Sequence, residues 1–262
     1  MPRVITLTTD FGLRDPFVGI MKGVLLSVCP SARLVDLTHE VPPHDVERGG
    51  LALEAAVAFF PPDTVHLAVV DPGVGSARRA IAVRAGGYVL VGPDNGLFTF
   101  ALEAAGWAAV AITAPEYRRP EVSRTFHGRD IFAPAAAYLA AGVPIERLGP
   151  PVTNPVRLRR PACRLEDGAL VGEVLDVDRF GNLLTSIPAA RLGELPGAGS
   201  PAVEVGGQPV GAPVDAYAQG REGEPGVIVG STGRLEIFVR SGHAGSRLGV
   251  GRGTTVRVKR SG

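Results

Sequence analysis

The sequence predicts an α/β fold: a largely parallel-sheet N-terminal domain with helices on both faces, followed by a small antiparallel C-terminal β-barrel domain. In the first part of the chain, short β-branched runs alternate with longer runs of helical periodicity, the pattern of strands joined by crossover helices. Further along, short strand-like runs follow one another between Gly, Pro and Asp turns, with little helical signal. A proline-rich stretch, residues 150–161, separates the two patterns, so we place the domains at residues 1–155 and 156–262.

Each element of the N-terminal domain rests on a local pattern. Residues 4–8 are a β-branched run that leads into Thr-Asp-Phe-Gly, which indicates a buried strand entering a loop. Residues 17–28 carry apolar side chains at helical spacing and stop before Pro30, which indicates a helix. The same criteria predict strands at 33–37, 64–70, 80–83 and 88–91, and helices at 46–60, 97–105 and 131–141.

The expected strands of the C-terminal domain are short and closely spaced. Turn-forming Gly, Pro and Asp residues separate them, as is usual in small antiparallel barrels. They lie at residues 170–177, 182–187, 202–205, 226–229, 235–239 and 254–258.

The charge balance and the cysteine content narrow the classes of partner. With 27 Lys and Arg against 26 Asp and Glu, the formal net charge is +1, so we expect no strong attraction to nucleic acid or to an anionic membrane. No apolar run reaches the length of a transmembrane helix, and the first residues lack the apolar segment of a signal peptide. Cys29 and Cys163 stand alone, without metal or redox spacing, which fits a reducing, cytoplasmic location.

Four polar clusters stand where chemistry is expected. Ligands of open parallel sheets bind beyond the carboxyl ends of the strands, and Asp10 and Asp71 follow two of the predicted strands. Asp71 opens the run Asp-Pro-Gly-Val-Gly-Ser-Ala-Arg-Arg. The other two clusters are Phe-His-Gly-Arg-Asp at 126–130 and Asp-Arg-Phe-Gly-Asn at 178–182. A turn, a helix cap or a hairpin would explain each cluster alone, whereas the four together favour a functional site.

Several common catalytic and cofactor motifs are absent from the sequence. No Gly-x-Gly-x-x-Gly follows the first predicted strand, and there is neither a Walker-type phosphate loop nor a His-Glu-x-x-His. The histidines show no zinc-site spacing, and His66, within an apolar strand, is more simply a core residue. No Gly-x-Ser-x-Gly supports a serine hydrolase. We therefore expect neither a metal nor an organic cofactor.

Ordered motifs along most of the chain resemble one family, the S-adenosylmethionine hydroxide adenosyltransferases, which are related to fluorinating and chlorinating enzymes that use the same substrate. The motifs are Thr-Thr-Asp-Phe-Gly at 8–12, Asp-Pro-Phe-Val-Gly-Ile-Met-Lys-Gly at 15–23, Asp-Pro-Gly-Val-Gly-Ser-Ala-Arg at 71–78, Gly-Pro-Asp-Asn-Gly-Leu at 92–97, and the clusters at 126–130 and 178–182. The resemblance implies the same two-domain fold. It also implies a homotrimer whose substrate lies between the N-terminal domain of one subunit and the C-terminal domain of its neighbour.

The resemblance also assigns roles to individual residues. The hydrolytic members carry an Asp-Arg-His set, which corresponds here to Asp71, Arg78 and His127, with the adjacent Arg79 as the less well-spaced alternative. Asp10 would hold the ribose, since a carboxylate accepts charge-assisted hydrogen bonds from two vicinal hydroxyls. The other implied substrate contacts are Asn95, Phe126, Phe180, Tyr217 and Ser231, Asp178 and Asn182 at the methionine end, and the backbone of residues 241–244 at the adenine edge.

The implied reaction is hydrolysis of S-adenosylmethionine to adenosine and methionine, by attack of an activated water on the ribose C5′. Asp71 could accept a hydrogen bond from the water and draw a proton away, and Arg78 could hold Asp71 or stabilise developing hydroxide charge. His127 could orient the water or share its proton, and the sequence leaves open whether Asp71 or His127 takes the proton. No cofactor is needed, because the sulfonium already makes methionine a good leaving group. Two alternatives stay open. One is a non-catalytic protein that binds S-adenosylmethionine or adenosine, and the other is a halogenase, which the negative charge of Asp71 disfavours.

Overall fold

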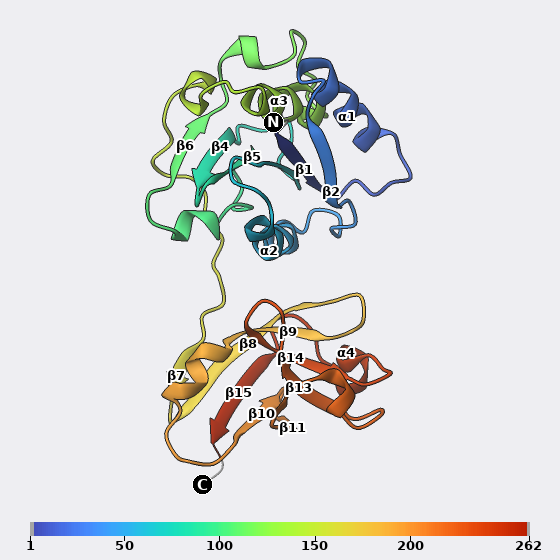
Figure 1. The fold of residues 1–262 in the computed structure, drawn as a ribbon, viewed down its shortest axis with the longest axis vertical. Coiled ribbons are helices and arrows are strands. Elements are labelled where there is room, and N and C mark those ends of the chain that lie inside the picture. Colours follow the sequence, from blue (N-terminus) through green and yellow to red (C-terminus); the bar gives the residue numbers. More distant parts are fainter. Residues whose placement is uncertain (1–2, 261–262) are drawn as a thin grey trace. The chain divides into compact units, whose positions relative to one another are not determined.

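The computed structural model describes residues 3–260, which fold into two compact units (Figure 1). The first unit ends at Leu158 and the second begins at Arg159. The sequence-based boundary, between residues 155 and 156, lies just before this division. Each unit has a hydrophobic core of its own, so each is described by itself.

The first unit is a mixed α/β structure built on a six-stranded sheet with the order β2-β1-β3-β5-β4-β6. Strands β2, β1, β3 and β5 run parallel, whereas β4 is antiparallel to both of its neighbours. Gly86 and Gly87, both with positive φ, join β4 to β5 in a tight hairpin, which forces antiparallel pairing. The strands are β1 Val4–Thr9, β2 Arg33–Thr38, β3 Val65–Val69, β4 Ala80–Ala85, β5 Tyr88–Pro93 and β6 Ala108–Ala111.

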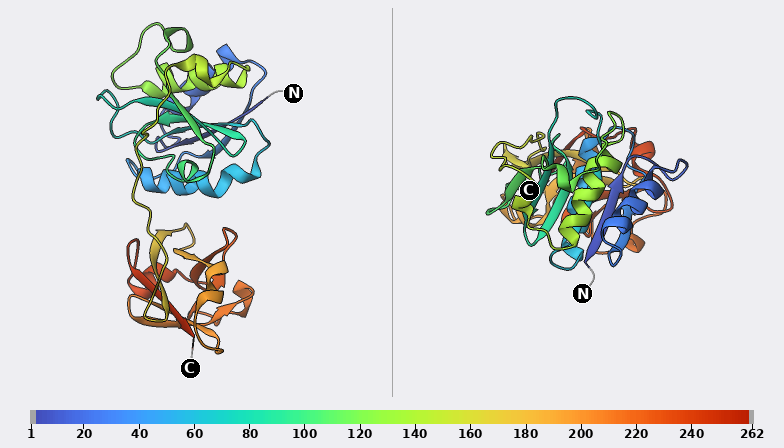
Figure 2. Two further views of the ribbon diagram at one scale, coloured as in Figure 1. Left: turned by 90° about the vertical axis from the view of Figure 1, so that its left-hand side faces the viewer. Right: turned by 90° about the horizontal axis from the view of Figure 1, so that it is seen from above.

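Helices cover both faces of this sheet (Figures 1 and 2). Helices α1 (Phe17–Val28) and α3 (Ala133–Ala140) lie on one face, where Leu25 belongs to a core shared with the strands. Helix α2 (Val46–Ala56) lies on the other face, where Leu53 belongs to a second core. The central strands β1 and β3 are therefore buried, whereas the edge strand β2 is largely exposed. The polar residues Asp10 and Asp71 follow the ends of β1 and β3.

The helix predicted for residues 97–105 is wrong. The segment holds only a 3₁₀ turn, Ala101–Glu103, although its apolar residues imitate helical spacing. Thr99 donates its hydroxyl to the carbonyl of Gly96 and accepts the amide of Leu158, so local side-chain hydrogen bonds replace a helical ladder. The other 3₁₀ turns are Val57–Phe59, Pro115–Tyr117, Ile145–Leu148, Ala189–Glu194 and Tyr217–Gln219.

The second unit is a nine-stranded, nearly barrel-shaped sheet with the order β11-β10-β15-β8-β9-β14-β13-β12 and β7 beside β8. Its pairing is antiparallel except between β12 and β13, which run parallel. A short helix, α4 (Ala244–Leu248), is an element that the sequence patterns do not predict. The strands are β7 Arg164–Glu166, β8 Ala169–Val177, β9 Leu183–Pro188, β10 Pro201–Val205, β11 Gln208–Gly211, β12 Pro213–Val214, β13 Pro225–Val229, β14 Arg234–Val239 and β15 Thr255–Arg260.

The connection between β8 and β9 carries the Asp-Arg-Phe-Gly-Asn cluster, residues 178–182. Gly181 has φ +87°, and a Cβ there would lie 2.1 Å from the ring of His243. Only glycine therefore fits this turn, which explains its place in the cluster. Within residues 3–260, no helix is long and apolar enough to cross a membrane.

Candidate active site

The loop after β3 folds back on itself so that Arg78 meets Asp71. The amide of Val74 donates to the carbonyl of Asp71, and the Ser76 hydroxyl donates to the carbonyl of Gly73 over 2.6 Å. Gly75 has φ +77°, and a Cβ there would lie 2.4 Å from the carbonyl oxygen of Arg124. Gly75 is therefore required by its left-handed φ and by the close approach of the Arg124 carbonyl.

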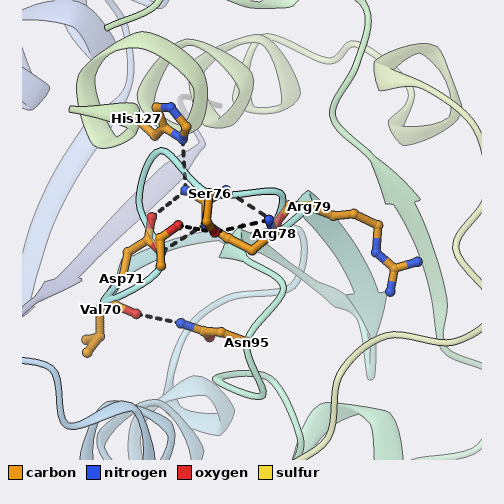
Figure 3. Close-up of polar contacts among 8 residues, drawn as sticks. Val70, Asp71, Ser76, Arg78, Arg79, Asn95 and His127 are labelled. Atoms are coloured by element: carbon orange, nitrogen blue, oxygen red, sulfur yellow. Dashed lines mark hydrogen bonds and ion pairs between the residues drawn. The ribbon is translucent and has the colours of Figure 1, made fainter. Parts of the chain in front are cut away.

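Asp71, Arg78 and His127 form one partly buried cluster (Figure 3). Arg78 donates from Nε to Asp71 Oδ1 over 2.9 Å and from Nη2 to Asp71 Oδ2. The same Nη2 lies 2.9 Å from His127 Nδ1. The side chains of Asp71 and Arg78 are only 5% and 10% exposed, so this bidentate pair is shielded from solvent.

The guanidinium of Arg78 rests over the ring of Phe132, 5.0 Å from its centroid. Phe132 ends a π-helical turn, Gly128–Phe132, that leads directly into α3. Such turns often occur at functional sites. The turn therefore carries both a support for Arg78 and, just before it, His127.

The contact with Arg78 fixes the protonation state of His127. A guanidinium can only donate, so His127 Nδ1 must accept and the ring proton must be on Nε2. Burial lowers the pKa of His127 below its usual value of 6.5, and the charge of Arg78 lowers it further, against the opposing charges of Asp71 and Asp130. His127 is therefore a neutral imidazole with Nε2–H as its donor.

Arg79 does not join this cluster, and Figure 3 shows its side chain extending away from Asp71. Its Nε donates to Asp94 Oδ2 over 2.7 Å, and its Nη1 and Nη2 donate to the side chain and carbonyl of Asn154. Asp94 is almost fully buried and also accepts the amide of Val156. Arg79 thus anchors the segment that follows residue 153, whereas Arg78 serves Asp71.

A cavity of about 320 Å³ lies at the carboxyl ends of β1 and β3. Asp71 and His127 both line it, while Arg78 joins them from behind. Phe11, Phe17 and Phe126 meet edge to face along it, with ring centroids 5.3 to 6.1 Å apart. The complete lining is Asp10, Phe11, Phe17, Pro43, His44, Val69, Asp71, Val74, Thr125, Phe126, His127 and Gly128.

Asp10 lines the cavity with one carboxylate oxygen already held. Its Oδ2 accepts the backbone amide of His44 over 2.8 Å. His44 has φ +68°, a left-handed conformation that costs energy for a residue other than glycine and is often found at functional sites. Sequence reasoning did not single out His44, because nothing in the Pro-Pro-His-Asp stretch marks it as a cavity residue.

Asn95 is not among the residues that line the cavity. Its Nδ2 donates to the carbonyl of Val70 over 2.8 Å, and its Oδ1 accepts the amide of Leu97 (Figure 3). This side chain therefore secures the backbone immediately before Asp71, and its amide is used for structure at that position.

Most of the remaining predicted contacts gather in the second unit. Asp178 Oδ1 accepts the amides of Phe180 and Asn182, and Asp178 Oδ2 accepts the side-chain amide of Asn182. Phe180 is 75% exposed. Tyr217 donates to Glu236 Oε1, and burial, that hydrogen bond and the nearby charges of Glu236 and Asp178 raise its pKa.

Two of the expected contacts lie in exposed turns of the second unit. Ser231 lies in the turn between β13 and β14. Within residues 241–244, Ser241 has φ +59°, and the imidazole of His243 accepts the amide of Ser246. Among the described residues 3–260, no group of His, Cys, Asp and Glu could hold a metal ion.

The fold and the cavity define an α/β enzyme that acts on a small molecule beyond the carboxyl edge of parallel strands. The chain belongs to the SAM hydroxide adenosyltransferase family, where SAM is S-adenosylmethionine: the model of the family's N-terminal domain matches residues 5–149, and that of its C-terminal domain matches residues 172–257.

Individual relatives agree with this family membership. The chain is 46% identical to a protein of Salinispora tropica named (R)-S-adenosyl-L-methionine hydrolase, over 97% of both chains. It is 30% identical to a fluorinase of Actinopolyspora mzabensis, over 98% of this chain and 97% of the relative. A crystal structure of an uncharacterized conserved protein from Thermotoga maritima is 38% identical, with a TM-score of 0.90 over 98% of this chain and 100% of that one.

Proposed function

We propose that this protein hydrolyses S-adenosylmethionine to adenosine and methionine. The observation that carries the proposal is the partly buried Asp71–Arg78–His127 cluster, with a carboxylate and an imidazole both lining one cavity. The hydrolase name of the Salinispora tropica relative supports the same reaction. That name also favours the (R) configuration at sulfur as the preferred substrate.

Asp71 is the proton acceptor in this mechanism. Nδ1 of His127 already accepts from Arg78, so the imidazole faces its other partners as an Nε2–H donor. A water that donates to the Asp71 carboxylate and accepts from His127 is oriented by both, and its proton passes to Asp71 as its oxygen bonds to C5′. The C5′–S bond breaks with its electron pair going to sulfur, so methionine leaves as a neutral thioether.

Substrate recognition divides between two sets of residues. In the first unit, Asp10 accepts hydrogen bonds from the ribose hydroxyls. The His44 amide holds one oxygen of this carboxylate and so fixes its orientation. The aromatic cluster around Phe126 supplies an apolar wall for the nucleoside. In the second unit, Asp178, Phe180, Asn182, Tyr217 and Ser231 bind the rest of the substrate, with Asp178 and Asn182 at the methionine end.

The proposal includes the homotrimer and the cytoplasmic location that the family resemblance and the composition imply. In that trimer, the cavity of one subunit is completed by the Asp178 loop of its neighbour. Both cysteines are free thiols, which supports a reducing compartment. Two inactive variants test the shared site: Asp71→Ala and Asp178→Ala, mixed and reassembled, recover activity only if each site draws on two subunits.

Halogenation at the same carbon is the alternative enzyme activity, and the site geometry opposes it. A halide would have to enter beside the ionised carboxylate of Asp71, and like charges repel strongly where solvent is excluded. Water carries no such penalty and gains a proton acceptor. The negative charge that readies water therefore excludes chloride and fluoride.

Incubation of the protein with S-adenosylmethionine in heavy-oxygen water tests the proposal. We expect adenosine carrying the heavy oxygen at its 5′-hydroxyl, with methionine in equal amount, and faster turnover of the (R) epimer. Unchanged substrate that nevertheless binds would favour a non-catalytic binding protein. Formation of 5′-chloro-5′-deoxyadenosine in the presence of chloride would establish halogenation instead.

A further inference from the structure

His39 lies outside the cavity, yet it joins the strand end that precedes Asp10 to the surface of the first unit. It follows β2 and is only 3% exposed. Its Nδ1 lies 2.8 Å from the hydroxyl of Thr9, and its Nε2 lies 3.0 Å from Asp36 Oδ1. Lys22 donates to the other oxygen of Asp36 over 2.6 Å. Polar contacts therefore run from β1 through His39 to an ion pair at the surface.

The hydrogen-bonding capacities in this chain of contacts fit together. The Thr9 hydroxyl accepts the amide of Phe11 over 3.2 Å and can still donate its own proton to His39 Nδ1. The ring proton is then on Nε2, within ion-pair distance of Asp36 although not aligned for a straight hydrogen bond. Burial alone would raise the pKa of Asp36, but its contacts with Lys22 and His39 hold it below the usual value, so this carboxyl is ionised.

His39 holds the loop after β1 at two points. Its side chain contacts Thr9, the last residue of β1, and its carbonyl accepts the amide of Gly12 over 2.8 Å. Asp10 and Phe11 lie between these two anchored residues, and both line the cavity. The direction of the Asp10 carboxylate is therefore set by a backbone that His39 fixes on either side.

The order Thr9, His39, Asp36 is that of a hydroxyl–imidazole–carboxylate triad, but it does not make Thr9 a nucleophile. Thr9 is fully buried and is not among the residues that line the cavity. Its hydroxyl is also occupied by both Phe11 and His39. These contacts have a positioning role, without a covalent step.

We propose that His39 is a positioning residue for substrate binding: through Thr9 and Gly12 it fixes the loop that presents Asp10 and Phe11 to the cavity. The inference rests on the proposed function for the identity of the substrate. It predicts an effect on the affinity for the nucleoside, because the loop carries Asp10, the proposed ribose ligand, and none of Asp71, Arg78 and His127.

The molecule contains a matched control for this contact. Thr6 and His66 make the same bond, hydroxyl to Nδ1 over 2.8 Å, between two fully buried residues. Thr6 lies earlier on β1, and neither Thr6 nor His66 lines the cavity. Thr6→Val and Thr9→Val therefore each remove a hydroxyl–Nδ1 hydrogen bond from β1. Thr9→Val also removes the acceptor of the Phe11 amide, and only this variant acts next to Asp10.

The experiment compares these variants by KM and kcat for S-adenosylmethionine and by calorimetric Kd for adenosine. We expect Thr9→Val and His39→Leu to raise KM and Kd about tenfold, the usual size of one buried hydrogen bond, with kcat lowered less than about threefold. His39→Asn retains an amide at the place of Nδ1 and recovers most of the affinity. Thr6→Val also lowers the melting temperature, but with KM and Kd unchanged.

A purely structural role for His39 predicts a different result. Thr9→Val would then leave KM and Kd unchanged, as Thr6→Val does, and that outcome overturns the inference. A fall in kcat at constant KM overturns it as well. If the wild-type protein binds adenosine but forms none from S-adenosylmethionine, the proposed function fails, while the adenosine Kd values still decide the role of His39. Wild-type protein that fails to bind adenosine overturns both.

Discussion

Arg78 donates to Nδ1 of His127 over 2.9 Å, and this contact decides how the imidazole takes part in chemistry. The ring can offer only Nε2–H as a donor to other partners while Arg78 holds Nδ1. Burial and the positive charge of Arg78 both lower the pKa of His127, so the neutral ring persists into mildly acidic solution. This geometry supports the proposed roles, in which His127 is a donor that orients water and Asp71 is the group that takes the proton.

The pH profile of kcat/KM tests this assignment. Protonation of His127 would place an N–H opposite the donor group of Arg78 and break the cluster. Because the pKa lies below 6.5, we expect kcat/KM to hold at neutral pH and to decline only in more acidic solution. His127→Asn keeps an acceptor for Arg78 but cannot titrate, so its profile should lack this acid limb. An identical limb in both proteins would assign it to another group.

Asp71→Asn removes the proton acceptor while keeping the shape of the side chain. We expect kcat to fall about a hundred- to ten-thousand-fold, the usual contribution of a general base, with the Kd for adenosine changed little. Chromatographic measurement of adenosine formation and calorimetry give the two quantities. Asp10→Asn is the matched control, because it should weaken adenosine binding more than it lowers kcat. Equal kcat in Asp71→Asn and wild type would remove Asp71 from the chemistry.

Substitution by lysine should lower the activity at Arg78 but mainly the stability at Arg79. Lys cannot reproduce the two-point contact of Arg78 with Asp71 together with the contact to His127, so we expect Arg78→Lys to lower kcat by about a hundredfold. Arg79→Lys should leave kcat within about twofold and lower stability by about 1 to 2 kcal/mol, since Asp94 and Asn154 lose donors. Steady-state rates and thermal melts of both variants measure this. A large loss of kcat in Arg79→Lys would contradict the division.

The parts of the fold that follow local patterns could be predicted from the sequence. The alternation of β1, α1, β2, α2 and β3 is visible because each element has its own periodicity and its own terminating residue. The helix predicted around Thr99 is wrong because apolar spacing was its only basis. That spacing cannot reveal that Thr99 forms hydrogen bonds with Gly96 and Leu158. The last of these contacts joins residues 59 apart, which no local pattern records.

The residues of the candidate catalytic cluster could be named from the sequence, whereas the contacts that support them could not. Asp71, Arg78 and His127 stand in recognisable motifs, so the sequence could name them as candidates. The support that His39 gives to Thr9 links residues 30 positions apart, and it exists only because β1 and β2 pair in parallel. The tautomer of His127 likewise depends on one contact between side chains 49 positions apart. Such contacts arise from tertiary packing, and a single sequence does not encode them in a readable pattern.

His66 makes the stability of the first unit depend on pH. Burial lowers its pKa from 6.5 to about 4, so the folded protein holds a neutral ring that the unfolded chain would protonate first. As the pH falls from 6.5 towards about 4, the unfolded chain takes up the proton before the folded protein does. The free energy of unfolding, which has its full value at neutral pH, therefore decreases progressively over this range. The shift corresponds to about 3 kcal/mol once the pH reaches the folded-state pKa.

His66→Asn removes the titration while keeping a polar partner for Thr6. We expect the variant to be less stable than the wild type at neutral pH, because the smaller side chain leaves space between Phe60 and Tyr88, yet to lose less stability on acidification. Urea unfolding followed by the fluorescence of Trp107, the single tryptophan, reports on the first unit alone. His44→Asn, which removes an exposed imidazole from the same unit, should keep the wild-type dependence on pH. Parallel curves for His66→Asn and wild type would show that protonation of His66 does not drive acid unfolding.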